Sequence, residues 1–280
     1  MADLHIDLLL VPFLAGLLVL ATHVPLGRMV LDRGIVFIDL AIAQVAGLGV
    51  LLAHFLGWEE SVWAVQMSAV AAALIGAAFL IWSEERFAVM QEAVIGVVFV
   101  FAASAELILL GFDAHGAEHL KDLLVGQILW VEPPQLVPVA ILYAAVLAIL
   151  YVGDLRRRRG LFYAVFAVTV TASVQLVGVY LVFSSLIVPA LAARNFPARA
   201  RLGAAYAIGL IGYALGLVAS ALVDIPTGAA IVCTLIAVAV LMPLLVKVGR
   251  PWRGGTESTA VTEGTDGAPE LAAERSRSRR

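Results

Sequence analysis

The sequence predicts an all-α fold, a polytopic bundle of membrane-spanning helices with about eight or nine transmembrane spans. Of its 280 residues, 62% are hydrophobic and only 14% are charged, which is more apolar side chain than one soluble core encloses. The apolar residues also fall in long runs, and a helix needs about 20 of them to cross a hydrocarbon core of about 30 Å. Because a backbone in lipid must satisfy its own hydrogen bonds, we expect each run to be helical.

Nine apolar segments follow one another along the chain. They are residues 8–24, 35–56, 62–82, 88–110, 136–152, 161–181, 182–193, 202–223 and 227–246. The seventh is too short to span upright and contains Pro189, so we expect a short or broken helix there. A further apolar stretch, 123–131, ends just before Pro133 and Pro134 and is either re-entrant or an extension of the fifth span.

The two ends of the chain differ from the spans. No basic segment precedes the first apolar run and no small-residue cleavage site follows it, so we expect the first span to be retained. Residues 247–280 are rich in Gly, Ser, Thr, Glu and Arg and carry no apolar stripe beyond position 254. We interpret them as a disordered cytoplasmic tail behind a membrane domain of residues 1–246.

Basic residues indicate how the bundle is oriented. Of the eleven Lys and Arg residues before the tail, ten fall on one side if the spans alternate, and Lys121 alone lies opposite. The ten are Arg28, Arg33, Arg86, Arg156, Arg157, Arg158, Arg159, Arg194, Arg199 and Arg201. Short cytoplasmic loops carry such an excess. We therefore expect a multi-pass protein of the cytoplasmic (inner) membrane, with its N-terminus outside and its tail inside.

Several classes of function are not supported by any motif. The sequence contains no GxxxxGK[ST] phosphate loop and no Ser/His/Asp or HExxH arrangement, so we expect neither an enzyme nor ATP hydrolysis by that route. The single cysteine, Cys233, excludes an intrachain disulfide and a Cys-based zinc site. Gly47 and Gly49 lie within a span, where close helix packing explains them better than a nucleotide site. No nucleic acid partner is expected.

Ionisable side chains within spans are costly and are therefore candidates for function. Asp39, early in the second span, and Glu106, in the outer half of the fourth, are the strongest candidates to line a transport path. For each, the alternative is a structural hydrogen bond between helices. Glu92 and His54 lie close to the interfaces, where water reaches them, so a structural role is the simpler interpretation.

The outer loop between the fourth and fifth spans carries a second cluster, His115, Glu118 and His119. Imidazole and carboxylate groups are suitable ligands for zinc, manganese or iron. In a helix the two histidines would share a face, although Gly116 weakens such a helix. A plain solvated acidic loop is the alternative.

A third feature lies on the cytoplasmic side, where Arg194, Arg199 and Arg201 follow the short seventh span. The three arginines fall within eight positions of one another. Anchoring by the excess of basic residues is sufficient by itself to explain them.

Two stretches go beyond generic hydrophobicity. Residues 177–194, VGVYLVFSSLIVPALAAR, and 224–231, DIPTGAAI, resemble the VGxLLVxALLxxPAxxAR and DLPSGAxI motifs of the ABC metal-ion permeases of the zinc, manganese and iron uptake type. Residues 33–39, RGIVFID, and 124–129, LVGQIL, follow in the family's order, the latter where the family shows LFGxxL. The resemblance covers about residues 10–246.

This resemblance implies the membrane permease subunit of an ABC importer for a divalent metal ion such as zinc, manganese or iron. Its partners would be a second permease copy, an extracytoplasmic metal-binding protein and cytosolic ATP-binding subunits. ATP would be used by those subunits, and this chain would bind no cofactor. Asp39 and Glu106 would line the path, the histidine loop would receive the ion, and residues 194–201 would dock the ATPase.

The sequence departs from the family pattern in two places. The family's second span usually reads D-x-L-x-H, whereas here Ala43 stands at the histidine position, followed by Gln44, a poorer transition-metal ligand. Residues 153–160 are short and basic where the family has a longer segment of acidic and small residues. The identity of the ion therefore stays open. The alternatives are an ion- or proton-coupled secondary carrier that protonates Asp39 and Glu106, and a membrane assembly or sensory protein.

Overall fold

The computed structural model describes residues 6–58, 61–111, 124, 126, 128–153, 155 and 158–248, and regular structure there is exclusively helical. The helices are α1 (Ile6–Arg33), α2 (Ile38–Phe55), α3 (Val62–Phe87), α4 (Gln91–Leu110), α6 (Pro133–Val152), α7 (Arg159–Val177), α8 (Val179–Ala192), α9 (Arg201–Val223) and α10 (Thr227–Val248). Short 3-10 turns lie at η1 (Ala88–Met90), η2 (Ile128–Trp130) and η3 (Ala193–Asn195). The all-α prediction is confirmed.

The helices have the lengths that a membrane requires. In the described part of the chain, seven helical stretches are long and apolar enough to span, and one of them, Val62–Leu110, comprises both α3 and α4. The predicted short helix is α8, with 14 residues and Pro189 inside it. The polytopic bundle is therefore confirmed, while two predicted boundaries shift: α1 continues to Arg33, and the chain breaks at Gly178 rather than after residue 181.

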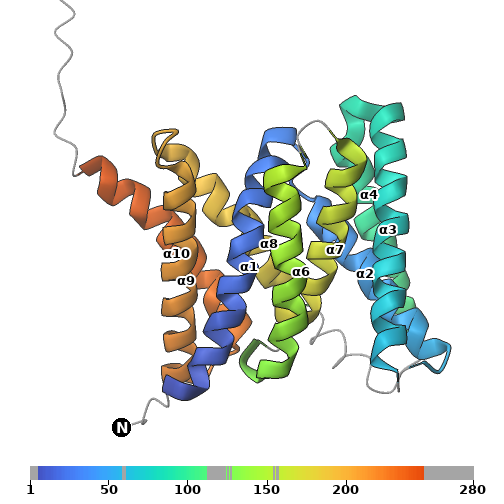
Figure 1. Ribbon diagram of the computed structural model, residues 1–280, viewed down its shortest axis with the longest axis horizontal. Coiled ribbons are helices and arrows are strands. Elements are labelled where there is room, and N and C mark those ends of the chain that lie inside the picture. Colours follow the sequence, from blue (N-terminus) through green and yellow to red (C-terminus); the bar gives the residue numbers. More distant parts are fainter. Residues whose placement is uncertain are drawn as a thin grey trace, which may run out of the picture.

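The helices lie side by side, and α7 is enclosed among them (Figure 1). On one flank α9 and α10 pack on each other and on α1 and α8, and on the other flank α2, α3 and α4 pack together. Inside α7, the hydroxyl groups of Thr169, Thr171 and Ser173 donate to carbonyls four residues earlier. Since these bonds stay within the helix, the three hydroxyl groups do not depend on a partner from a neighbouring helix.

A sharp elbow separates α7 from α8. Gly178 has φ 84, a backbone conformation that favours glycine. Gly126, with φ 70, lies so close to the Val177–Gly178 peptide that a β-carbon there has no space. Because Val131 and Glu132 are not helical and α6 begins at Pro133, the stretch 123–131 is not an extension of the fifth span. Within this stretch Gly126 packs against the elbow, and η2 contacts α1 and α10.

Residues 224–231, which carry part of the family resemblance, form the turn between α9 and α10 and the first residues of α10. Asp224 ends α9 in the left-handed region, with φ 56. The hydroxyl of Ser220 donates to the carbonyl of Ile225 at 2.7 Å and lies 2.7 Å from the hydroxyl of Thr227. The motif therefore closes a helix hairpin whose polar groups are satisfied locally.

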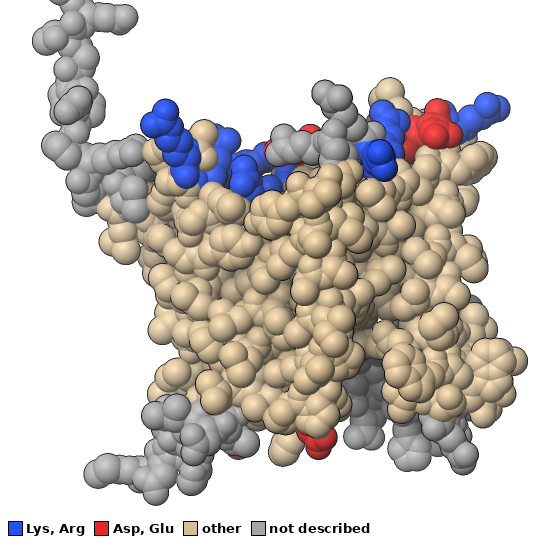
Figure 2. Space-filling model, in the orientation of Figure 1, with Lys and Arg blue, Asp and Glu red and all other residues tan. Residues whose placement is uncertain are grey.

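Basic side chains gather at one edge of the bundle, and α1 begins at the opposite edge (Figures 1 and 2). We call this edge the basic rim. Its described basic residues at helix ends are Arg33, Arg86, Arg158, Arg159, Arg194, Arg199 and Arg201. The rim is the arrangement that the alternating topology requires.

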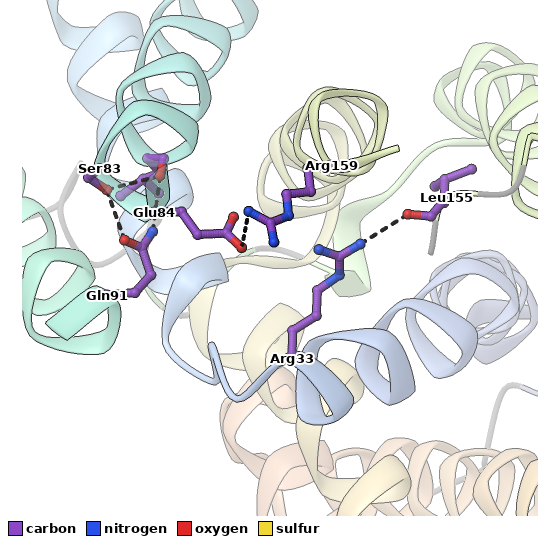
Figure 3. A network of polar contacts seen from close by, with 7 residues as sticks. Arg33, Ser83, Glu84, Gln91, Leu155 and Arg159 are labelled. Atoms are coloured by element: carbon purple, nitrogen blue, oxygen red, sulfur yellow. Dashed lines mark hydrogen bonds and ion pairs between the residues drawn. The ribbon is translucent and has the colours of Figure 1, made fainter. Parts of the chain in front are cut away.

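Polar contacts tie the helix ends at the basic rim to one another (Figure 3). Arg33, at the end of α1, donates to the carbonyl of Leu155 at 3.0 Å, and its guanidinium lies 4.3 Å from the centre of the Phe162 ring of α7. Arg159 of α7 lies 3.7 Å from Glu84 of α3. Charged side chains, as well as apolar packing, therefore connect the ends of α1, α3 and α7 at the basic rim.

Close packing of α1 on α8 yields a first prediction. Gly27 faces the carbonyl of Leu186 with no room for a β-carbon, whereas nothing lies within 4 Å of a β-carbon at Gly203. We expect Gly27→Ala to lower the free energy of unfolding by about 2 kcal/mol, as overpacking does. Gly203→Ala, the control, should be neutral or slightly stabilising because alanine favours a helix. Thermal unfolding of both variants in detergent checks this, and equal stability would contradict the close contact.

Candidate functional site

Glu106 of α4 is a buried carboxylate, 2% exposed, that α2 accommodates. With the amide of Gln44 oriented so that its nitrogen faces the carboxylate, Gln44 donates to both oxygens, 3.2 Å from Oε1. Gly47, three residues further along α2, leaves open the space that Oε1 occupies. Gln44 and Gly47 share a helix face, so one face of α2 supplies both a hydrogen-bond donor and room for Glu106. Gly49 contacts α3 closely, so both glycines serve helix packing as predicted.

A cavity of about 420 Å³ lies beside this pair, among α2, α4, α8 and α10. Its polar lining comes from Gln44, Glu106, Tyr180 and Ser184, and the other walls are apolar. Carboxylate, amide and hydroxyl groups offer mainly oxygen ligands, which suit hard divalent cations better than soft ones. Among the described residues, no group of three or more His, Cys, Asp or Glu could hold a metal ion. Glu106 is thus the one charged side chain among the described residues that line the cavity.

Asp39 lies in the first turn of α2 and is 1% exposed. Neither of its carboxylate oxygens has a hydrogen bond of normal geometry, although the amides of Asp39 and Leu40 face them. Asp39 precedes Gln44 by five residues, about 7.5 Å along the helix and closer to the basic rim. Leu40 lines the cavity and Asp39 does not. The structure thus places the two predicted carboxylates on neighbouring helices at different depths, and no hydrogen bond between the described residues joins them.

Glu92 and His54 lie near the two ends of α2, and each makes a hydrogen bond. Oε1 of Glu92, in α4, accepts the N–H of Phe37 at 3.2 Å. Nδ1 of His54 lies 2.9 Å from the carbonyl of Val50, within α2 itself. Both contacts agree with the structural interpretation of these residues.

The remaining predicted site residues are distributed between the rim and the loop. Arg194, in η3, donates to the carbonyl of Leu31 at 3.0 Å. Arg194, Arg199 and Arg201 are all exposed at the basic rim. His115, Glu118 and His119 lie outside the described residues.

The sequence analysis did not identify two of the polar residues that line the cavity, Tyr180 and Ser184. Tyr180 and Ser184 lie within the motif at 177–194, but the motif does not say which of its side chains face a cavity. That depends on the rotation of α8 about its own axis, which the elbow at Gly178 decides. The neighbouring hydroxyl, Ser185, instead bonds the carbonyl of Leu181 and lies 2.8 Å from the hydroxyl of Tyr213.

The Gln44–Glu106 contact yields a double-mutant prediction. Gln44→Leu leaves a buried carboxylate unpaired, and we expect it to destabilise the bundle by about 1 kcal/mol or more. Glu106→Leu removes the carboxylate, so the added change Gln44→Leu should then cost much less. Unfolding of the two single variants and the double variant in detergent gives the coupling. Strictly additive effects would show that the two side chains do not interact.

Comparison with known proteins places the chain in a family. It matches the model of the ABC 3 transport family over residues 5–158 and 154–246. PsaBC from Streptococcus pneumoniae, solved in complex with a Fab, is similar with a TM-score of 0.66 and 19% identity, over 85% of this chain and 91% of that chain.

A second similar structure is described as a metal-chelate type ABC transporter in an inward-facing conformation. Its TM-score is 0.60 at 18% identity, over 85% of each chain. At these identities the two structures show the shared fold, while the family model matches nearly all of the membrane part of the sequence. The resemblance seen in the motifs is thereby confirmed, and the chain belongs to the ABC 3 transport family.

Proposed function

We propose that this chain is the membrane permease subunit of an ABC transporter that imports a divalent metal ion, namely zinc, manganese or iron. The observation that carries the proposal is Glu106, a buried carboxylate that borders a cavity of about 420 Å³ among membrane-spanning helices. A carboxylate in a span is costly and faces an ion path far more often than lipid. The family match supports the same function.

The path would follow α2. Glu106 and Gln44 border the cavity, and Asp39 lies about 7.5 Å closer to the basic rim. Two carboxylates at different depths would attract a cation one after the other. Because each depth offers few ligands, the cation would be bound weakly enough to move on. Ala43, which stands in place of the family's histidine, is buried and offers no ligand. Gln44 instead orients Glu106, so oxygen atoms replace the imidazole nitrogen.

Energy would come from separate cytosolic ATPase subunits, because the chain contains no phosphate loop. The exposed residues Arg194, Arg199 and Arg201 offer a docking surface at the basic rim, which we assign to the cytoplasmic side. A second permease copy would complete the path. An extracytoplasmic metal-binding protein would deliver the ion to the opposite edge, where His115, Glu118 and His119 remain candidates from the sequence alone.

The carboxylates give the decisive test. Asp39→Asn and Glu106→Gln keep shape and most hydrogen bonding but remove the charge that attracts a divalent ion. We expect uptake of zinc, manganese or iron to fall by about tenfold or more, since the charge is what offsets desolvation of the ion. Membrane abundance and association with the ATPase should stay normal. Glu85→Gln, which removes an exposed carboxylate at the end of α3, is the control.

Two outcomes would contradict the proposal. Wild-type uptake by both variants would remove the two carboxylates from the path. Uptake that persists without an ATPase subunit and depends on a proton gradient would favour the secondary carrier instead.

The basic rim yields a prediction about the ATPase. Arg199→Glu and Arg201→Glu together reverse two exposed charges without touching the contact of Arg194 with Leu31. If residues 194–201 dock the ATPase, this variant should lose most of the ATPase that copurifies with the wild type, because like charges at an interface repel. Arg86→Glu, at the end of α3, is the matched control. Equal recovery of ATPase with all three proteins would return residues 194–201 to a purely anchoring role.

A further inference from the structure

The helix that carries Asp39 begins without a side-chain cap of its own. Its N-cap residue is Phe37, whose side chain cannot accept a hydrogen bond. The first N–H groups of a helix have no partners within the helix, so they need acceptors from elsewhere. Glu92, in the first turn of α4, supplies one: its Oε1 accepts the N–H of Phe37 at 3.2 Å. The negative carboxylate also faces the positive end of the α2 dipole.

The first turn of α4 is itself held in place. Gln91, the residue before Glu92, donates from Nε2 to the carbonyl of Leu80 at 3.0 Å and accepts from the hydroxyl of Ser83 at 3.0 Å. Both partners belong to α3, and Figure 3 shows Ser83 and Gln91 beside the ion pair of Glu84 with Arg159. Adjacent residues of α4 thus bind two different helices. Gln91 anchors the turn to α3, and Glu92 reaches from that anchor to α2.

Two features of the path depend on where Phe37 lies. Asp39 is two residues further on, and its buried carboxylate has no hydrogen bond of normal geometry to hold it. Its placement is therefore set by the backbone of the first turn. The ring of Phe37 stacks on Phe183 of α8, with centroids 6.3 Å apart and planes at 5°. Phe183 is a wall of the cavity.

We propose that Glu92 is a positioning residue of the transport path. By accepting the N–H of Phe37 it fixes the first turn of α2, and with it both Asp39 and the Phe37–Phe183 wall. The inference rests on the proposed function, because it takes Asp39 as part of the path. Holding the amide requires a hydrogen-bond acceptor, and the ion never needs to touch Glu92.

Transport measurements separate this role from a direct one. In the full-length chain assembled with its ATPase, Glu92→Ala should lower the maximal uptake rate of zinc, manganese or iron by about tenfold, the order of effect that the loss of one hydrogen bond produces. The apparent affinity should change by less than about twofold, because the Gln44–Glu106 pair stays in place. Glu92→Gln keeps an acceptor and should recover most of the rate. Glu85→Ala, an exposed carboxylate at the end of α3, is the control.

The outcomes that overturn the proposal are equally defined. A Glu92→Gln variant as slow as Glu92→Ala would mean that the charge itself acts on the ion. A normal rate per folded transporter in Glu92→Ala, with lower abundance or thermal stability, would mean a structural role only.

A second measurement does not depend on what is transported. Hydrogen exchange of the amides in residues 35–42, followed on the purified full-length chain without metal, reports on the first turn of α2. Exchange should be faster in Glu92→Ala and close to wild type in Glu92→Gln and Glu85→Ala. Unchanged exchange in Glu92→Ala would overturn the role of Glu92 whatever the substrate. If the exchange pattern is as expected but the wild-type complex transports none of the three metals, the proposed substrate is refuted. The exchange result would then still support Glu92 as the residue that positions the first turn of α2.

Discussion

The high cost of an unpaired polar group in lipid governs this structure more than any single contact. Most buried hydroxyl groups meet that cost locally, as Thr169 and Thr171 do by bonding carbonyls of their own helix. Where no local acceptor suffices, a second helix supplies the partner, as α2 does when Gln44 donates to Glu106. Polar contacts between helices therefore fix how neighbouring helices are aligned along their axes. In the middle of the bundle, the Gln44–Glu106 pair is such a contact.

Close approach of helices follows from the same environment. Lipid tails are as apolar as leucine, so helices associate through packing and hydrogen bonds rather than through exclusion from water. Gly27 brings α1 against the carbonyl of Leu186, and Gly126 meets the elbow at Gly178. Gly47 combines packing with function, because the missing β-carbon is what admits the carboxylate of Glu106. A glycine in this bundle can thus be part of a site without offering any ligand.

The two carboxylates of the proposed path differ in how they are held. Glu106 has a side-chain partner, whereas Asp39 relies on the start of α2. That start is connected through Glu92 and Gln91 to α3, and α3 is connected through Glu84 to Arg159 of α7. These contacts link Arg159, at the start of α7, to the first turn of α2.

The sequence was enough to predict the class of the protein, because hydropathy and the distribution of arginine are local properties that need no knowledge of neighbours. It predicted the spans, the short helix around Pro189, the family, and the two carboxylates at Asp39 and Glu106. The folded structure was needed to show that Gln44 faces Glu106, that the chain breaks at Gly178, and that Glu92 accepts an amide 55 residues away along the chain. These depend on which helices are adjacent and how each is rotated about its axis, and helices that are apolar on every side leave that rotation unmarked in the sequence.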